Sequence, residues 1–113
     1  MKKFIYKICK TDEWTKAKKK RKFIGNKKDV MDGFIHFSKK TQVRSTLKKY
    51  FLNIDNLILL KVDATKIDNL IFEKSSGGAF FPHLYSDLNL NCIKKTYKRI
   101  LKKDGYHYLP STF

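Results

Sequence analysis

Residues 57–63 read LILLKVD and form the strongest strand signal in this 113-residue chain. The run is almost continuously aliphatic, which is typical of a strand with both faces buried. A polar loop at residues 53–56 precedes it. We therefore expect residues 57–63 to form a central strand, with the rest of the chain folded around it.

Four other segments also have strand-like composition, at residues 3–9, 34–38, 70–73 and 93–100. The first three are rich in Phe, Ile and Tyr and are bounded by turn-forming or polar residues. In the last, basic and apolar residues mix in a period that suits either a helix or a strand. Its β-branched and aromatic residues favour the strand.

Two short helices are predicted between these strands. Thr11 is placed to cap the first, which runs to about Lys20. Ser38 is placed to cap the second. A buried stripe at i, i+4, i+7 and i+8 indicates that second helix, and its members are Val43, Leu47, Tyr50 and Phe51.

Strands and helices mix without strict alternation, so the predicted class is α+β. A chain of 113 residues with 42% hydrophobic and 14% aromatic residues can build one core without disulfide or metal cross-links. We expect a single domain at residues 1–101 and a C-terminal tail at residues 102–113.

Several classes of protein are disfavoured by what the sequence lacks. Cys9 and Cys92 are isolated, which predicts reduced thiols rather than a disulfide or a metal site. No apolar run reaches membrane-spanning length and no secretory leader is present, so we expect a cytoplasmic protein without a membrane partner. Motifs of dinucleotide-binding Rossmann folds, P-loops, zinc hydrolases and serine hydrolases are also absent.

The net charge of +16 raises the question of a nucleic-acid partner. Basic residues cluster at residues 16–22 and 94–103, but all except three of the 26 are lysine rather than arginine. Arginine is the usual choice for bidentate recognition of phosphate and guanine. RNA binding through a lysine-rich surface and a merely solvated basic surface both remain open.

A histidine lies inside the apolar segment 34–38. In an extended strand His36 shares a face with Phe34 and with Ser38, while Ile35 and Phe37 point the other way. A titratable ring and a hydroxyl on one face suit a small binding pocket. A core histidine satisfied by backbone groups is an equally good interpretation.

A second histidine occurs in the segment FPHLY at residues 81–85. Pro82 favours an extended backbone, which would place His83 and Tyr85 side by side. The flexible segment 75–78 precedes them, so the segment suits a loop that closes over a ligand. Aromatic residues that fill the edge of the core are the alternative.

Glu73 ends the strand segment 70–73 and is the acidic residue nearest in order to both histidine segments. It is a candidate to bind a ribose hydroxyl or to act as a general base. A solvated glutamate paired with lysine is the alternative. His107, in the tail, has no partner that the sequence suggests, and we expect it on the surface.

Taken in order, these segments resemble the bacterial family known as domain of unknown function 952. The resemblance spans about residues 4–100 and is most specific in the two histidine segments. The matching residues are Ile5-Tyr6-Lys7-Ile8, Glu13-Trp14, residues 32–38, Gln42, Tyr50-Phe51, residues 59–63 and residues 81–85. That family is similar in fold to the ADP-ribosyltransferases, and most similar to the RNA 2′-phosphotransferases.

The resemblance implies a split, curved antiparallel sheet with a cleft that takes NAD or a phosphorylated ribose. Tyr6-Lys7 and residues 34–38 resemble the two cleft strands, and Lys7 stands where the superfamily has a ribose-holding histidine. The implied catalytic residues are His36, Glu73 and His83. The implied substrate-binding residues are Tyr6, Lys7, Ser38 and Tyr85.

Three functions follow from these observations. The first is an enzyme that transfers an ADP-ribosyl or phosphoribosyl group, with NAD as its substrate and without a metal. The second is a non-catalytic module that binds a small nucleotide-like ligand. The third is a basic RNA-associated protein. The sequence does not indicate the oligomeric state.

Overall fold

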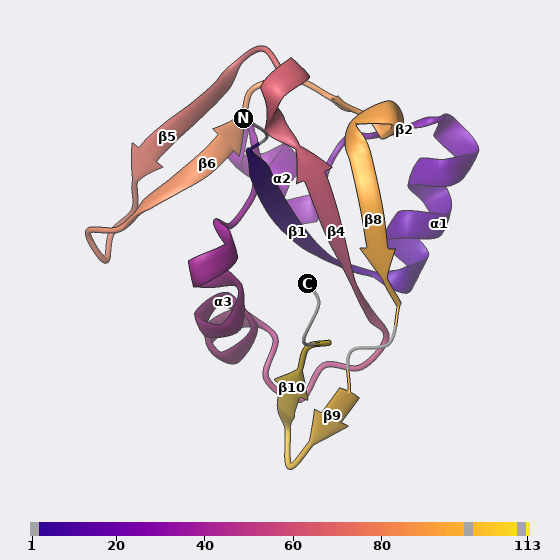
Figure 1. Cartoon of the computed structure of the whole chain (residues 1–113), viewed down its shortest axis with the longest axis vertical. Coiled ribbons are helices and arrows are strands. Elements are labelled where there is room, and N and C mark those ends of the chain that lie inside the picture. The colour runs from indigo at the N-terminus through magenta and orange to yellow at the C-terminus, as the bar shows by residue number, and fades with distance from the viewer. Residues whose placement is uncertain (1–2, 99–100, 111–112) are drawn as a thin grey trace.

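The strand predicted at residues 57–63 is β4 (Leu57–Asp63), the middle strand of a three-stranded antiparallel sheet (Figure 1). Its neighbours are β1 (Phe4–Lys10) and β8 (Ile93–Tyr97). The structure is a computed structural model that describes residues 3–98, 101–110 and 113. Every residue of β4 except Lys61 is buried, which explains its almost continuous apolar sequence.

Each face of this sheet supports its own hydrophobic cluster. On one face, Trp14 and Ala17 of α1 (Thr11–Lys20) pack with Ile5, Ile58 and Leu60. The other face is covered by α3 (Val43–Tyr50), whose buried residues Val43 and Leu47 join Ile8, Leu57 and Leu59. The two predicted helices are therefore confirmed, and each presents an apolar stripe to the sheet. Two details were wrong: Lys10 rather than Thr11 is the N-cap of α1, and Tyr50 of the predicted stripe is exposed.

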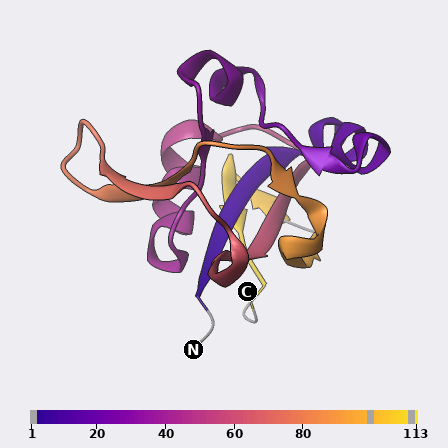
Figure 2. The ribbon, with the colours of Figure 1, turned by 90° about the horizontal axis from the view of Figure 1, so that it is seen from above.

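A second three-stranded antiparallel sheet has the order β3 (Ile35–His36), β6 (Phe80–Leu84) and β5 (Leu70–Lys74). Its β5–β6 hairpin projects from the body of the molecule (Figure 2). One antiparallel bridge joins the two sheets, because Tyr6 N–H donates to Ser38 O at 2.8 Å and Ser38 N–H donates to Tyr6 O at 2.7 Å. The antiparallel α+β class is confirmed.

A helix that the sequence analysis did not predict is α2 (Lys27–Asp32). The Asn26 side chain accepts from Asp29 N–H at 2.9 Å, and the Asp29 carboxylate accepts from Asn26 N–H at 2.9 Å. Gly33 ends the helix in the left-handed region with φ of 84°. Asn26 and Gly33 thus cap the two ends of one short helix.

Ser38 does not cap α3, so that prediction was wrong. A 3₁₀ turn, η1 (Lys40–Gln42), precedes the helix, and the Gln42 side chain accepts from Lys39 N–H at 2.9 Å. Ser38 is held by the bridge to Tyr6, and its hydroxyl lies 3.2 Å from the Thr46 hydroxyl. Ser38 therefore pairs with Tyr6 between the two sheets instead of capping the helix.

Residues 81–84 form part of a strand rather than a closing loop. Pro82 is accommodated because its backbone faces β3, where its carbonyl accepts from Phe37 N–H at 3.0 Å. The Pro82 nitrogen faces the same side as its carbonyl, so the missing N–H costs the ladder to β5 no hydrogen bond. His83 consequently lies on the middle strand of the sheet, with β3 on one side and β5 on the other.

The segment predicted as a tail contains an antiparallel hairpin of β9 (Leu101–Lys103) and β10 (Tyr106–Tyr108). Phe113 is buried and contacts the Tyr6 ring edge to face at 5.7 Å. His107 is half-buried, and its Nε2 lies 2.6 Å from Ile54 O, so the prediction of a surface position was wrong.

The remaining elements are short. They are β2 (Lys22–Phe23), which pairs with β7 (Leu88–Asn89), and the 3₁₀ turns η2 (Ala64–Lys66) and η3 (Leu90–Cys92). Within the described ranges, no helix is long and apolar enough to cross a bilayer.

Candidate functional site

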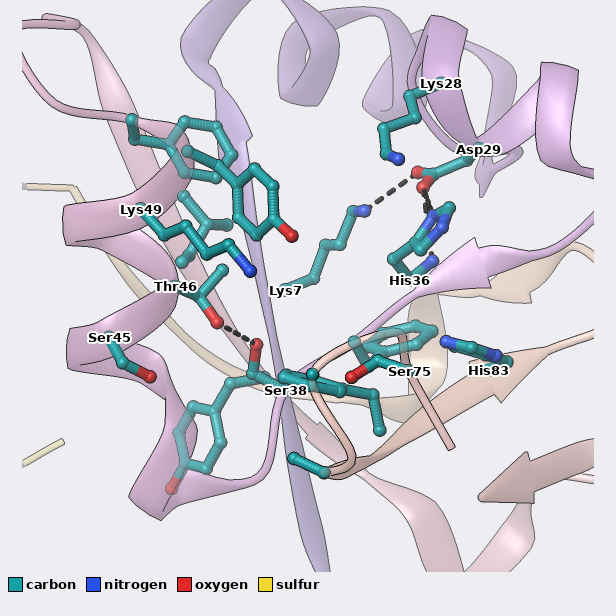
Figure 3. A pocket seen from close by; sticks show the side chains of 18 of the residues that line it. Lys7, Lys28, Asp29, His36, Ser38, Ser45, Thr46, Lys49, Ser75 and His83 are labelled. Carbon is teal, nitrogen blue, oxygen red and sulfur yellow. Dashed lines mark hydrogen bonds and ion pairs between the residues drawn. The ribbon is translucent and has the colours of Figure 1, made fainter. Parts of the chain in front are cut away.

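A cavity of about 510 Å³ opens beside the outer edge of β1, where the two sheets meet (Figure 3). Tyr6, Lys7 and Ile8 form its base. The N-terminal part of α2 and His36 line one wall, and α3 lines the opposite wall. The β5–β6 turn and His83 complete the rim. Cavities of this size commonly hold small ligands.

Lys7 is the most unusual residue of this cavity. Its side chain is 5% exposed, and its Nζ lies 2.8 Å from Oδ2 of Asp29. Lysine is rarely buried unless it is paired, and removal of its partner would leave a desolvated charge. Figure 3 shows the ammonium group pointing toward Asp29 on the α2 wall.

Asp29 organises the α2 wall. Besides Lys7 and the Asn26 backbone, it contacts His36 twice: Oδ1 lies 2.6 Å from Nδ1 and accepts from the His36 N–H at 3.1 Å. Burial alone would raise the pKa of Asp29. The His36 hydrogen bond and the Lys7 charge outweigh that effect and lower its pKa to about 2. The group is therefore a carboxylate at neutral pH.

Gly25 makes room for this carboxylate. Its φ is 98°, and a Cβ at this position would lie 2.5 Å from Cβ of Asp29. Both the backbone conformation and the close approach require glycine. The backbone before α2 is thus shaped around the Asp29 side chain.

His36 and His83 face each other across β3 and β6, where they occupy paired positions. Their ring centroids are 5.4 Å apart with an interplanar angle of 70°. Phe34 stacks on His83 at 4.1 Å and contacts His36 at 4.6 Å. The two histidines predicted from the sequence therefore lie together on one face and both line the cavity.

Each imidazole has a carboxylate at Nδ1. Asp29 Oδ1 contacts Nδ1 of His36, and Glu73 Oε1 lies 2.9 Å from Nδ1 of His83. Nε2 of His36 also lies 3.1 Å from Asp32 Oδ2, whereas no partner is found for Nε2 of His83 in the described part of the chain. A carboxylate at Nδ1 orients the ring and leaves Nε2 as the reactive atom.

Glu73 and Tyr85 lie outside the lining of the cavity. The Tyr85 hydroxyl donates to Glu73 Oε1 at 2.5 Å. That bond, followed by the one from His83, lowers the pKa of Glu73, and the same contact with Glu73 raises the pKa of Tyr85. The structure therefore places Glu73 behind His83 rather than against the space that a ligand would fill.

Tyr6 and Ser38 are both buried where the sheets join. Burial first, and then the charge of Tyr97, raise the pKa of the Tyr6 phenol. Because its ring packs into the α3-side cluster, Tyr6 contributes mainly as a part of the cavity base. Ser38 adds a hydroxyl to a group on the α3 side that includes Ser45 and Thr46.

Sequence reasoning missed Asp29, Lys28, Lys49 and the hydroxyls of Ser45, Thr46 and Ser75. One signal was available, since Asn26 followed three residues later by Asp29 is a capping-box pattern. The lysines could not have been separated from the many solvated ones by sequence alone.

The family model of the proteins of unknown function DUF952 matches residues 8–96. This chain belongs to the DUF952 family. A crystal structure of the protein CC0527 from Caulobacter crescentus is 40% identical, with a TM-score of 0.87 and coverage of 93% of both chains. This confirms the family expected from the two histidine segments.

Two other structures of CC0527 give the same result for the DUF952 fold. A crystal structure of a double mutant has a TM-score of 0.88 at 40% identity and 93% coverage of both chains. A solution NMR structure has a TM-score of 0.81 at 40% identity, covering 91% of this chain and 90% of that one. No match was found among curated proteins.

Proposed function

We propose that the cavity binds a small phosphorylated, ribose-containing molecule such as NAD. The donors that line the cavity carry this proposal. Lys7, Lys28 and Lys49 lie around it, and Asp29 is the one carboxylate among the described lining residues. An excess of ammonium groups with hydroxyls beside them suits phosphate oxygens and ribose hydroxyls.

The outer edge of β1 supplies a second kind of recognition. Both backbone groups of Tyr6 point away from β4 to Ser38, so those of Ile8, two residues later, point the same way. Ile8 lines the cavity, and we find no partner for these two groups in the described residues. A carboxamide or a nucleobase edge, with a donor and an acceptor in one plane, fits such a strand edge.

The arrangement of the sheets also supports the proposal. Two antiparallel sheets held together at Tyr6 and Ser38, with a cavity beside the junction, agree with the expected ADP-ribosyltransferase-like split sheet. In this proposal His36 and Lys7 bind the ribose side of the ligand, and the α3 hydroxyls and Lys49 bind a phosphate.

The positions of the carboxylates favour a protein that binds this ligand over one that transfers its ADP-ribosyl group. Transfer at the ribose needs a free carboxylate near the oxocarbenium-like centre. Asp29 is already engaged by Lys7 and His36, and Glu73 lies behind His83. Replacement of Glu73 by Gln should therefore leave ligand affinity unchanged. A large loss of NAD-dependent transfer in this variant would favour the transferase instead.

A basic RNA-associated function is the second candidate, favoured by a separate observation. Lys18, Lys19, Lys20 and Arg21 are all exposed at the C-terminal end of α1. Retention on RNA with a steep salt dependence, lost when these four residues are neutralised, would support this function. Equal binding to any polyanion would show that the attraction is non-specific and comes from surface charge alone.

Calorimetric titration with NAD, ADP-ribose, ribose 5-phosphate and unphosphorylated ribose tests the main proposal. We expect saturable binding of the phosphorylated compounds and none of free ribose. Lys49→Gln should weaken binding roughly tenfold, as the loss of one charged hydrogen bond predicts. Lys48→Gln removes an equal charge from the next residue, which does not line the cavity, and should have no effect. Absence of binding by all four compounds would overturn the proposal.

A further inference from the structure

We propose that His36 and His83 form an acid–base pair that hydrolyses a ribose phosphodiester in this cavity. The inference rests on the proposed function, because it names a reaction of the same ligand class at the same site. The pair is built into the backbone ladder rather than into a loop, since the two residues are directly opposite each other on β3 and β6. Both rings line the cavity with centroids 5.4 Å apart, close enough for one phosphate group to contact both of them.

The surroundings of the two rings differ in the way that an acid–base pair requires. His36 has a carboxylate at each nitrogen, Asp29 at 2.6 Å and Asp32 at 3.1 Å, and it donates both hydrogen bonds only as the imidazolium. His83 has Glu73 at Nδ1, which leaves a lone pair at Nε2 in the neutral ring. His36 is therefore the acid and His83 is the base.

A substrate can replace Asp32 as the hydrogen-bond partner of His36 Nε2. The Asp32 side chain is 38% exposed and also faces Lys28 at 3.5 Å, so a substrate oxygen can take its place at Nε2 of His36. Asp29, by contrast, is 1% exposed and keeps the other nitrogen of the ring in place. The ring therefore stays oriented while its outer proton is transferred.

The reaction balances with water as the only co-reactant. His83 Nε2 takes a proton from water as the water oxygen forms a bond to phosphorus. The bond from phosphorus to one ribose oxygen breaks, and that oxygen takes the proton from Nε2 of His36. The product is a phosphomonoester with a free ribose hydroxyl, and exchange with solvent restores both rings.

Lys7 supplies the charge that this reaction needs. Its buried ammonium group lies against Asp29, which also holds His36, so it faces the same part of the cavity (Figure 3). A fixed cation in a poorly hydrated site stabilises the charge that develops on the phosphoryl oxygens. Phe34 packs against both imidazoles and limits their rotation.

The probe is a nucleoside 2′,3′-cyclic phosphate, which is a small ribose phosphodiester. Its conversion to a monoester is followed by ³¹P NMR in the presence of EDTA, and its binding is measured separately by calorimetry. We expect turnover by the unaltered protein, and a loss of about 100-fold or more in His83→Gln and in His36→Gln. His107→Gln makes the same change away from the cavity and should keep full turnover.

The outcomes separate this inference from the proposed function. Saturable binding of the cyclic phosphate without hydrolysis would overturn the inference and leave the binding function intact. Hydrolysis that survives both cavity-histidine substitutions, or that EDTA abolishes, would also overturn it. If neither the cyclic phosphate nor the four compounds of the first test binds, both proposals fail. Because His36→Gln can disturb Asp29, His83→Gln with retained binding and unchanged melting temperature is the decisive variant.

Discussion

The imidazoles of His36 and His83 lie edge to face, with centroids 5.4 Å apart, although they come from distant parts of the sequence. The register of β3 and β6 pairs them directly, and a separate carboxylate holds each ring by Nδ1. Backbone pairing therefore sets the geometry of the cavity wall, and we expect it to change little when a ligand enters.

Asp29→Asn should be among the most destabilising substitutions in this protein. It removes the partner of the buried Lys7 and a hydrogen-bond acceptor of His36. Breaking a buried pair by removing one partner typically costs 3–5 kcal/mol, and we expect a loss of about that size in urea unfolding.

Asp32→Asn is the matched control for this substitution. It makes the same chemical change on the same helix, at a side chain that is 38% exposed. We expect a loss below about 1 kcal/mol. Similar losses for the two variants would mean that the Lys7–Asp29 pair does not hold the α2 wall.

Acid should weaken the fold through Asp29. Its pKa is about 2 in the folded protein, below its ordinary value of 3.8. A depressed pKa contributes stability that is present above the unfolded value and lost as the pH falls toward the folded value. Asp29 should thus contribute about 2 kcal/mol at neutral pH, lost between about pH 4 and pH 2.

Comparison of unfolding curves at these pH values checks the effect. In Asp29→Asn the decline over this range should be smaller by that amount. If the two proteins lost stability in parallel, other carboxylates would account for the acid sensitivity.

Glu73 and Tyr85 should titrate as a coupled pair. The Glu73 hydrogen bond raises the pKa of Tyr85, so Glu73→Gln should move that pKa down toward 10.0. Tyr85→Phe removes the donor that contributes most to the low pKa of Glu73, which should therefore rise. NMR titrations of a labelled tyrosine ring and of labelled glutamate measure both shifts. Unchanged values in both variants would show that the contact is not formed in solution.

Gly25→Ala and Gly33→Ala separate backbone strain from steric conflict. Both positions have positive φ, at 98° and 84°, so each alanine costs roughly 1–2 kcal/mol of strain. Only at Gly25 would the added Cβ collide with Asp29, whereas nothing lies within 4 Å at Gly33. The Gly25 variant should be clearly less stable and should weaken ligand binding. Equal effects on stability, with binding intact, would argue against a role of Gly25 in placing Asp29.

The sequence predicted the parts of the fold that depend on local pattern. The continuous apolar run of β4 and the stripe of α3 both reflect burial that a linear pattern records. Ser38 was misassigned because a residue suited to a helix cap is equally suited to a bridge between sheets. Local propensity does not distinguish these two uses.

The site was predictable in part for a similar reason. His36 and His83 stand out because each is a single polar ring in an apolar segment. Lys7 was named only through the family resemblance, and Asp29 was missed. Their buried pairing could not be predicted, because it forms only when the fold brings α2 beside the edge of β1. Glu73 was predicted near both histidine segments as a hydroxyl-binding or general-base residue. The structure places it behind the His83 ring and outside the cavity lining, which no sequence pattern records.

A ¹⁵N-resolved NMR titration of the protein with ADP-ribose tests most directly whether the cavity binds a ribose phosphate. We expect saturable shifts concentrated at the amides of Ile8, Ser38, Thr46 and Ser75, all of which line the cavity. Lys49→Gln should weaken this binding and Lys48→Gln should not. Shifts that do not saturate, or that gather at the exposed lysines of α1 instead, would contradict the assignment of the cavity as a ribose-phosphate site.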